Sequence, residues 1–128
     1  MPYRLEITDT FSAAHAIVLQ GEREPLHGHD WLVTLTIERD ALDEDGLVCD
    51  FHALERALGA VLDPWRNRTL NDLPPFAGGE VNPTAERVAE HIAGALTTHI
   101  PPPARLVSVR VTEAVGCAAT VYPGPPGH

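Results

Sequence analysis

Apolar and polar residues alternate in four segments of this chain, as they do along β-strands that have one buried face. These segments are residues 3–8, 31–38, 106–113 and 118–122. Residues 10–29 can extend the first hairpin, with residues 20–25 as a long loop. Because residues i and i+2 of a strand share a side, each segment predicts one apolar face and one polar face.

Two other segments have apolar residues at helical spacing. Asp50 is expected to cap the first helix, since its carboxylate can accept hydrogen bonds from free backbone N–H groups. Its apolar stripe is Phe51, Leu54, Leu58, Val61 and Leu62. The second helix is expected to start at Asn82-Pro83, with asparagine as the cap. Its stripe is Val88, Ile92, Ala95 and Leu96. Between them, residues 63–80 contain three prolines and two adjacent glycines and predict a loop.

The predicted order is β-β-α-α-β-β, which favours an α+β fold. In this fold, a four-stranded antiparallel sheet carries both helices on one face. A chain of 128 residues predicts one domain, expected at residues 1–122, with residues 123–128 as a disordered tail. Such a sheet has one bare face and two free edges. We therefore expect a homo-oligomer that covers them.

Composition and charge narrow the function further. The net charge is −9, and all nine basic residues are scattered arginines, which argues against a nucleic-acid or anionic membrane partner. No apolar run approaches the roughly 20 residues of a membrane span. The charged N-terminus does not resemble a signal peptide, and two cysteines make no disulfide framework. A cytoplasmic location is therefore expected.

His27-Gly28-His29 is the sharpest local motif. Histidines at positions i and i+2 of a strand point to the same side, so both imidazoles can bind one zinc ion. His15 is the candidate third ligand, because a hairpin would bring it near this motif. A His-x-His pattern is also common by chance. A single histidine such as His15 is more often a buried, hydrogen-bonded residue than a ligand.

The segments around these histidines resemble the 6-pyruvoyl-tetrahydropterin synthase family, which includes the 6-carboxytetrahydropterin synthases. The similarity is carried first by Phe11-Ser-Ala-Ala-His15 and Leu26-His-Gly-His-Asp-Trp31. It continues in Gly46-Leu-Val-Cys-Asp50-Phe51-x-x-Leu54, Leu70-Asn71-Asp72, Asn82-Pro83-Thr84-x-Glu86 and Val109-x-Val111-x-Glu113. The resemblance spans residues 3–122.

The resemblance implies a tunnelling fold, in which three subunits join their sheets into a barrel and two trimers stack as a hexamer. It implies that His15, His27 and His29 bind Zn²⁺ at a subunit interface. The implied substrate is 7,8-dihydroneopterin triphosphate or a close pterin, and zinc would act on its side-chain oxygens as a Lewis acid.

The resemblance also implies two residues that bind the pterin ring. Glu113 matches the family's pterin anchor, and a carboxylate can accept two hydrogen bonds from the 2-amino and ring N–H edge. Thr84 matches a threonine that helps to seat the ring. The alternative for Glu113 is a solvated carboxylate at a strand end. The alternative for Thr84 is a hydroxyl that serves the start of a helix.

The expected catalytic base departs from the family pattern. Arg23 stands where the family has a catalytic cysteine, and arginine is not a base near neutral pH. Glu24 lies three residues before His27, and Glu-x-x-His-Gly-His resembles the type III subgroup. That subgroup uses a glutamate and makes 6-hydroxymethyl-7,8-dihydropterin. Glu24 is therefore the candidate base, and an acidic surface loop is the alternative.

A second departure concerns the family's Asp-His pair, which relays a proton. Arg66 and Asn67 take those positions here, and neither titrates near pH 7. His91 is a possible substitute, although a structural role is more common for such a residue. Arg66 and Arg68 could instead bind phosphate oxygens or pair with surface carboxylates.

The sequence thus favours a zinc-dependent lyase that acts on a pterin side chain. Two alternatives remain open. One is a pterin-binding paralogue whose catalysis is lost or redirected, because the cysteine and the Asp-His pair are absent. The other is a structural zinc protein with an empty pocket.

Overall fold

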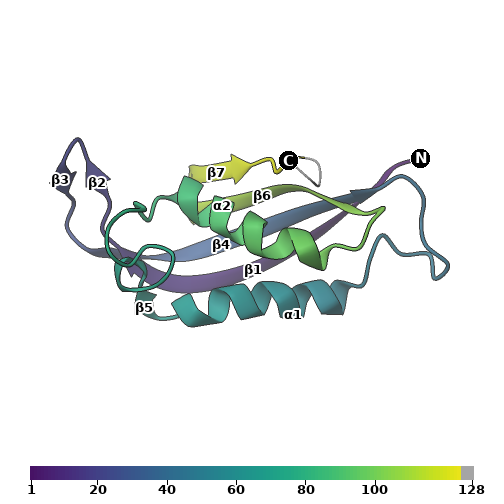
Figure 1. The fold of residues 1–128 in the computed structure, drawn as a ribbon, viewed down its shortest axis with the longest axis horizontal. Helices are drawn as coiled ribbons and strands as arrows, with labels where there is room; N and C mark the ends of the chain where they lie inside the picture. The colour runs from purple at the N-terminus through teal and green to yellow at the C-terminus, as the bar shows by residue number, and fades with distance from the viewer. Residues whose placement is uncertain (125–128) are drawn as a thin grey trace.

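The computed structural model describes residues 1–124 (Figure 1). Its strands are β1 (Tyr3–His15), β2 (Val18–Leu19), β3 (Glu22–Arg23), β4 (His27–Arg39), β5 (Arg68–Thr69), β6 (Arg105–Ala114) and β7 (Cys117–Val121). Its α-helices are α1 (Phe51–Leu62) and α2 (Ala85–Leu96). Short 3₁₀ helices cover Asp63–Trp65, Leu70–Asp72 and Thr97–His99. Part of the expected tail, residues 125–128, lies outside the described residues.

The main sheet has the strand order β5-β1-β4-β6-β7. Its four longer strands pair antiparallel, as the alternation predicts. The segment predicted as a loop contributes a fifth strand, β5, which pairs parallel to the end of β1 at Ala13 and Ala14. A strand of two residues is too short to show alternation, so no sequence pattern could indicate it. The short β2–β3 hairpin extends beyond this end of the sheet (Figure 1).

Strands β1 and β4 are both 13 residues long, which is longer than their apolar alternation predicts. They pair without interruption from Tyr3 opposite Arg39 to His15 opposite His27. The apolar pattern stops early because His15, His27 and His29 occupy face positions that apolar residues hold elsewhere along the strands. The hairpin therefore continues into the region that carries the candidate site.

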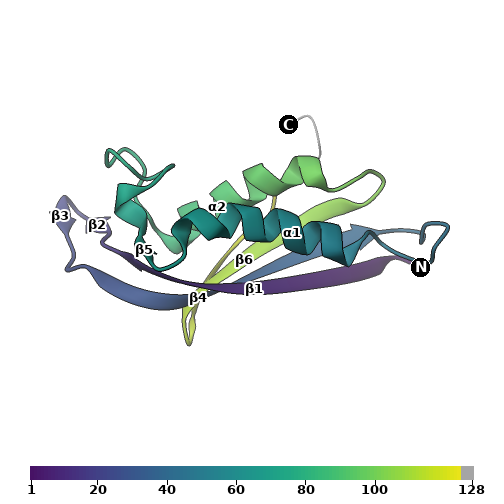
Figure 2. The same cartoon turned by 90° about the horizontal axis from the view of Figure 1, so that it is seen from below.

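Both helices cover the same face of the sheet, which gives the α+β arrangement expected from the sequence (Figure 2). Helix α1 packs on β1, and α2 packs on β6 and β7. The side chains between the layers include the fully buried Trp31, Val33, Leu35, Val109 and Val111. The opposite face carries exposed polar side chains and has no covering layer in residues 1–124. The described residues contain no helix with the length and apolar character needed to cross a membrane.

The two helix starts are set by different residues. Asp50 caps α1 as predicted, and its Oδ1 accepts a hydrogen bond of 2.9 Å from the backbone N–H of His52. The prediction that Asn82 caps α2 is wrong by two residues. Thr84 is the cap, and its Oγ1 accepts from the N–H of Arg87 at 3.1 Å. The amide of Asn82 is bound instead to another segment.

Burial of His91 links the stability of this fold to pH. His91 lies in α2 against Trp65, with ring centroids 5.3 Å apart, and burial lowers its pKa below the ordinary value. The unfolded chain therefore binds more protons than the folded chain once the pH falls below about 6.5, and stability decreases there. We expect His91→Gln to lose less stability between pH 7.5 and pH 5.5 than the wild type, in urea unfolding experiments. Part of the loss of stability at low pH should remain in the variant, because burial also lowers the pKa of His29. Equal losses in both proteins would contradict the prediction.

Candidate metal centre

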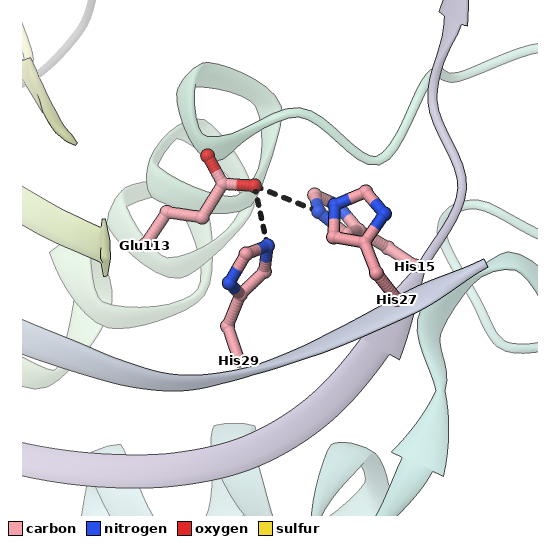
Figure 3. A group of neighbouring side chains, drawn as sticks. All are labelled: His15, His27, His29 and Glu113. Carbon is pink, nitrogen blue, oxygen red and sulfur yellow. Dashed lines mark ion pairs between the residues drawn. The ribbon is translucent and has the colours of Figure 1, made fainter. Parts of the chain in front are cut away.

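Three histidines meet at the end of the β1–β4 hairpin (Figure 3). His15 is the last residue of β1 and lies directly opposite His27, the first residue of β4. His29 follows two residues later, so its side chain lies on the same face. The ring centroids are 4.7 to 5.1 Å apart. The structure thus brings together the three residues that the sequence predicts as ligands.

Glu113 of β6 completes this cluster. Its Oε1 lies 2.7 Å from His15 Nε2 and 3.1 Å from His29 Nε2, and its other oxygen points away from the histidines (Figure 3). One potential ligand atom from each of the four residues lies within 4.8 Å of all the others. The carboxylate that the resemblance implies as a pterin anchor therefore faces the histidines instead of standing free at a strand end.

Backbone carbonyls orient two of the imidazole rings. Nδ1 of His15 donates to the carbonyl of Pro83 at 2.7 Å, and Nδ1 of His27 donates to the carbonyl of Pro25 at 2.8 Å. Because a carbonyl oxygen can only accept, the proton of each neutral ring must be on Nδ1. Each Nε2 therefore keeps its lone pair, which is the arrangement of metal-binding histidines.

Two buried ring nitrogens of the cluster lack a hydrogen-bond partner among the described residues, and a bound metal ion would explain this. His15 is only 1% exposed, and the Nε2 atoms of His15 and His29 are buried; within residues 1–124 they face Glu113 Oε1, at 2.7 and 3.1 Å, without hydrogen-bond geometry. Leaving buried polar atoms unpaired is costly. Burial also lowers the pKa of His29, which favours its neutral, metal-binding form. Three imidazoles and one carboxylate suit a divalent ion such as zinc.

Trp31 forms the apolar wall of the site. It is fully buried, and its ring meets those of His15 and His29 nearly edge to face, at centroid distances of 4.9 and 5.6 Å. Its Nε1 donates to the carbonyl of Ala13 at 3.1 Å, which holds the indole in place. The wall restricts movement of both imidazoles and reduces their contact with water.

Two asparagines hold the segment that follows His15. Asn71 accepts from the N–H of Ala16 at 2.9 Å and donates to its carbonyl at 2.7 Å. Asn82 makes the same pair of bonds to Val18, both at 2.9 Å. The sequence predicts neither of these contacts: Asn82 is expected there as a helix cap, and Asn71 only as part of the Leu70-Asn71-Asp72 motif. Their signal was weak, because an asparagine in a loop is equally typical of caps and turns.

The candidate base Glu24 lies beside this held segment. Its backbone N–H donates to the carbonyl of Ile17 at 2.9 Å, and the residue is half-buried between β3 and β4. Glu24 is not one of the four residues of the cluster. It directly precedes Pro25, whose carbonyl orients His27.

Arg66 is bound to β1 and to its own loop. It donates to Asp63 at 2.8 Å, to Asp9 at 3.0 Å and to the carbonyl of Thr10 at 2.6 Å. The hydrogen bond to Asp63, with help from Asp9, raises the pKa of Arg66 above its ordinary range. The guanidinium therefore remains charged, and its hydrogen bonds connect the loop after α1 to β1.

The remaining candidates lie in three different places. Arg68 and Asn67 line an open pocket of about 430 Å³ that also includes His29. His91 packs against Trp65 and is not in the cluster. The hydroxyl of Thr84 caps α2, as the alternative interpretation of this residue expects.

Removal of the Asn82 amide tests whether its two hydrogen bonds stabilise the backbone at Val18. We expect Asn82→Ala to destabilise the protein by about 1–2 kcal/mol, since it leaves both backbone groups of Val18 without these partners. The amide hydrogen of Val18 should exchange faster with solvent, as measured by NMR. The matched variant Asn82→Asp retains the acceptor and should keep more of the protection. Unchanged exchange at Val18 in the alanine variant would contradict this role.

The family model described as 6-pyruvoyl tetrahydropterin synthase matches residues 4–124. The chain is also similar to the 6-carboxy-5,6,7,8-tetrahydropterin synthase of Bacillus subtilis, with 32% identity over 97 residues. This alignment covers 71% of the chain and 64% of the relative, so the chain spans less than two thirds of that protein's length.

Solved structures share the fold. The 6-pyruvoyl tetrahydropterin synthase of Caenorhabditis elegans superposes with a TM-score of 0.83 at 23% identity, over 97% of both chains. A Plasmodium vivax 6-pyruvoyltetrahydropterin synthase superposes with a TM-score of 0.76 at 20% identity, over 98% of this chain and 99% of that one. The Plasmodium vivax protein in this structure is a variant, in which a glutamate described as a catalytic residue is replaced by alanine. The match over residues 4–124 shows that this chain belongs to the 6-pyruvoyl tetrahydropterin synthase family.

Proposed function

We propose that this chain is a zinc-dependent lyase that acts on the side chain of 7,8-dihydroneopterin triphosphate or a close pterin. The observation that carries the proposal is the convergence of three histidines and one carboxylate on the same face of the sheet. Membership of the family supports the pterin substrate class. The name of the Bacillus subtilis relative supports chemistry on a reduced pterin.

His15, His27 and His29 are the proposed zinc ligands. Two of the rings have their Nδ1 protons held by carbonyls, which directs their Nε2 lone pairs to a common point. Three protein ligands leave a position open for substrate, as in other catalytic zinc sites. When bound, zinc supplies Lewis acidity that polarises side-chain oxygens and makes the neighbouring C–H more acidic.

Glu113 is the proposed anchor of the pterin ring. A carboxylate can accept hydrogen bonds from the 2-amino group and the adjacent ring N–H at the same time, which selects for a guanidine-like edge. Its position beside the histidines supports ring recognition close to the proposed metal site. Thr84 belongs to this proposal only as a residue at the start of α2, because its hydroxyl oxygen already accepts from Arg87.

Glu24 is the proposed base, and 6-hydroxymethyl-7,8-dihydropterin is the proposed product. Arg23, at the position of the family's cysteine, cannot accept a proton near neutral pH. Glu24 lies next to Pro25 and to the segment that Asn71 and Asn82 hold. The catalytic glutamate described for the Plasmodium vivax protein supports a carboxylate in this role.

A second candidate function is pterin binding without this catalysis. Arg66, at one position of the family's Asp-His pair, is held by Asp63, Asp9 and Thr10 and cannot relay a proton. A protein of this kind would retain Glu113 and the metal site but release no product from the pterin substrate.

We also propose that the protein is a homo-oligomer, a trimer or a hexamer, with the site at a subunit interface. Within residues 1–124, the outer edge of β7 has no partner strand, and most of β1 is free on the side of β5. The hairpin near the cluster exposes three apolar side chains, Val18, Leu19 and Leu26. Contact with a neighbouring subunit would cover these surfaces.

Loss of one ligand tests the metal centre. We expect purified wild-type protein to contain about one zinc per subunit, and His27→Ala to contain far less, because a site with two remaining histidines binds weakly. Metal analysis by mass spectrometry measures this. His52→Ala, which removes an exposed histidine of α1, is the control and should keep its metal. Unchanged metal content in His27→Ala would refute the site.

Replacement of Glu24 tests the reaction. We expect Glu24→Gln to lower turnover of 7,8-dihydroneopterin triphosphate by about 10²–10⁴-fold, the contribution of a general base. Pterin binding should persist. The control is Glu22→Gln in exposed β3. Triphosphate release and the mass of the pterin product are the measurements.

The product distinguishes the functional alternatives. A hydroxymethyl product that disappears with Glu24 supports the proposal. A carboxy or pyruvoyl product means that another residue replaces the cysteine, and full activity of Glu24→Gln excludes Glu24. A wild-type protein that binds the pterin without turnover favours the second candidate function.

A further inference from the structure

Glu113, the proposed anchor of the pterin ring, lies within the histidine cluster. We propose that Glu113 closes the histidine site as a fourth metal ligand while no pterin is bound, and that a pterin draws it away and opens the site. This inference rests on the proposed function, because it takes the metal centre and the pterin anchor as given. It adds a coupling between them: binding of the ring exposes the metal position that the substrate side chain needs.

The geometry of the cluster carries the first step. Oε1 of Glu113 is 2.7 Å from His15 Nε2 and 3.1 Å from His29 Nε2. The ligand atoms of a tetrahedral zinc site are about 3.3 Å apart, given metal–ligand distances of 2.0–2.1 Å. The cluster already holds its four potential ligand atoms within 4.8 Å of one another. Small side-chain rotations would therefore place Glu113 in the first coordination shell.

Charge favours the same arrangement. The rings of His15 and His27 each give the Nδ1 proton to a carbonyl, so each can offer a neutral Nε2 lone pair to a metal ion. Three neutral ligands leave the double charge of a divalent ion uncompensated beside the apolar Trp31. Glu113 is the acidic residue of the cluster and supplies the opposite charge.

Glu113 is also the ligand that is free to leave. The pairing of β6 with β7 shifts between Thr112 and Ala114, so Glu113 lies at an irregularity of the ladder. Such irregularities re-aim side chains. Its side chain is 26% exposed, against 1% for His15. Among residues 1–124, no hydrogen bond holds the Glu113 side chain as the carbonyls hold the rings of His15 and His27.

The two roles compete because they need different orientations of the carboxylate. A pterin edge that takes two hydrogen bonds engages both oxygens, whereas Oε1 points at the histidines and the other oxygen points away from them (Figure 3). Turning both oxygens toward the ring draws Oε1 away from the metal position and weakens its bond to the metal. Linkage requires the converse as well: the metal weakens binding of the ring by the same factor.

The first test uses Co²⁺, whose visible absorption depends on coordination. Wild type, Glu113→Gln and the control Glu55→Gln, an exposed residue of α1, are titrated with Co²⁺ in the absence of pterin. We expect the Glu113 variant to bind Co²⁺ at least tenfold more weakly and with an altered spectrum, and the control to match the wild type. An unchanged affinity and spectrum in Glu113→Gln would overturn the inference.

The second test measures the sign of the coupling with pterin that lacks a side chain. Its dissociation constant is measured by fluorescence with metal-free protein and by competition with Co²⁺-loaded protein. We expect binding several-fold tighter without metal, because Glu113 is then available. Equal binding, or tighter binding to the loaded protein, would overturn the inference, since direct contact with the metal would give that result.

The two proposals fail in different ways. If His27→Ala binds Co²⁺ as well as the wild type, the metal centre itself is wrong and the inference falls with it. If His27→Ala loses the metal but Glu113→Gln does not, the metal centre stands and only the role of Glu113 as a fourth ligand is rejected.

Discussion

The register of β1 against β4 is the constraint on which the rest of this structure depends. It places His15 opposite His27 and sends both side chains, with that of His29, to the helix-covered face. A slip of one residue would turn one strand's side chains to the bare face and separate the ligands. The same register stacks Phe11 on Trp31, with ring centroids 5.7 Å apart. The apolar core and the polar cluster are therefore fixed by one set of backbone hydrogen bonds.

The cluster lies where the apolar core ends, and the surrounding loops complete it. Carbonyls of Pro83 and Pro25 hold two rings, so the start of α2 and the approach to β4 contribute to the site. Asn71 and Asn82 hold the segment after His15 through the backbone of Ala16 and Val18. Buried apolar residues such as Leu70 and Phe76 attach the loop before α2 to the core, and specific hydrogen bonds fix the segments that face the cluster. This is how irregular backbone can present functional groups accurately.

The departures from the family pattern have a physical meaning in the fold. Arg66 joins its loop to β1 through Asp9 and Thr10, so the position serves attachment instead of proton transfer. Chemistry that needs a base must then rely on another group, and Glu24 is the carboxylate next to the held segment. Glu113 of β6 lies beside the histidines of the β1–β4 hairpin. The candidate residues of the site thus come from β1, β4, β6 and the loop between β3 and β4.

Periodicity determined the two helices, the four longer strands and the order of these elements along the chain, because apolar spacing along a strand or helix is a local property. The spacing of His27 and His29 likewise determined that two candidate ligands share a face. Tertiary structure decided what depends on distant segments: the pairing of β5 with β1, the carbonyl partners of the histidines, and the bonds from Asn71 and Asn82 to the backbone after His15. It also decided that Glu113 faces the histidines, with β6 and β1 about 100 residues apart in sequence. Local patterns cannot encode such contacts, because packing of the whole sheet determines which side chains meet.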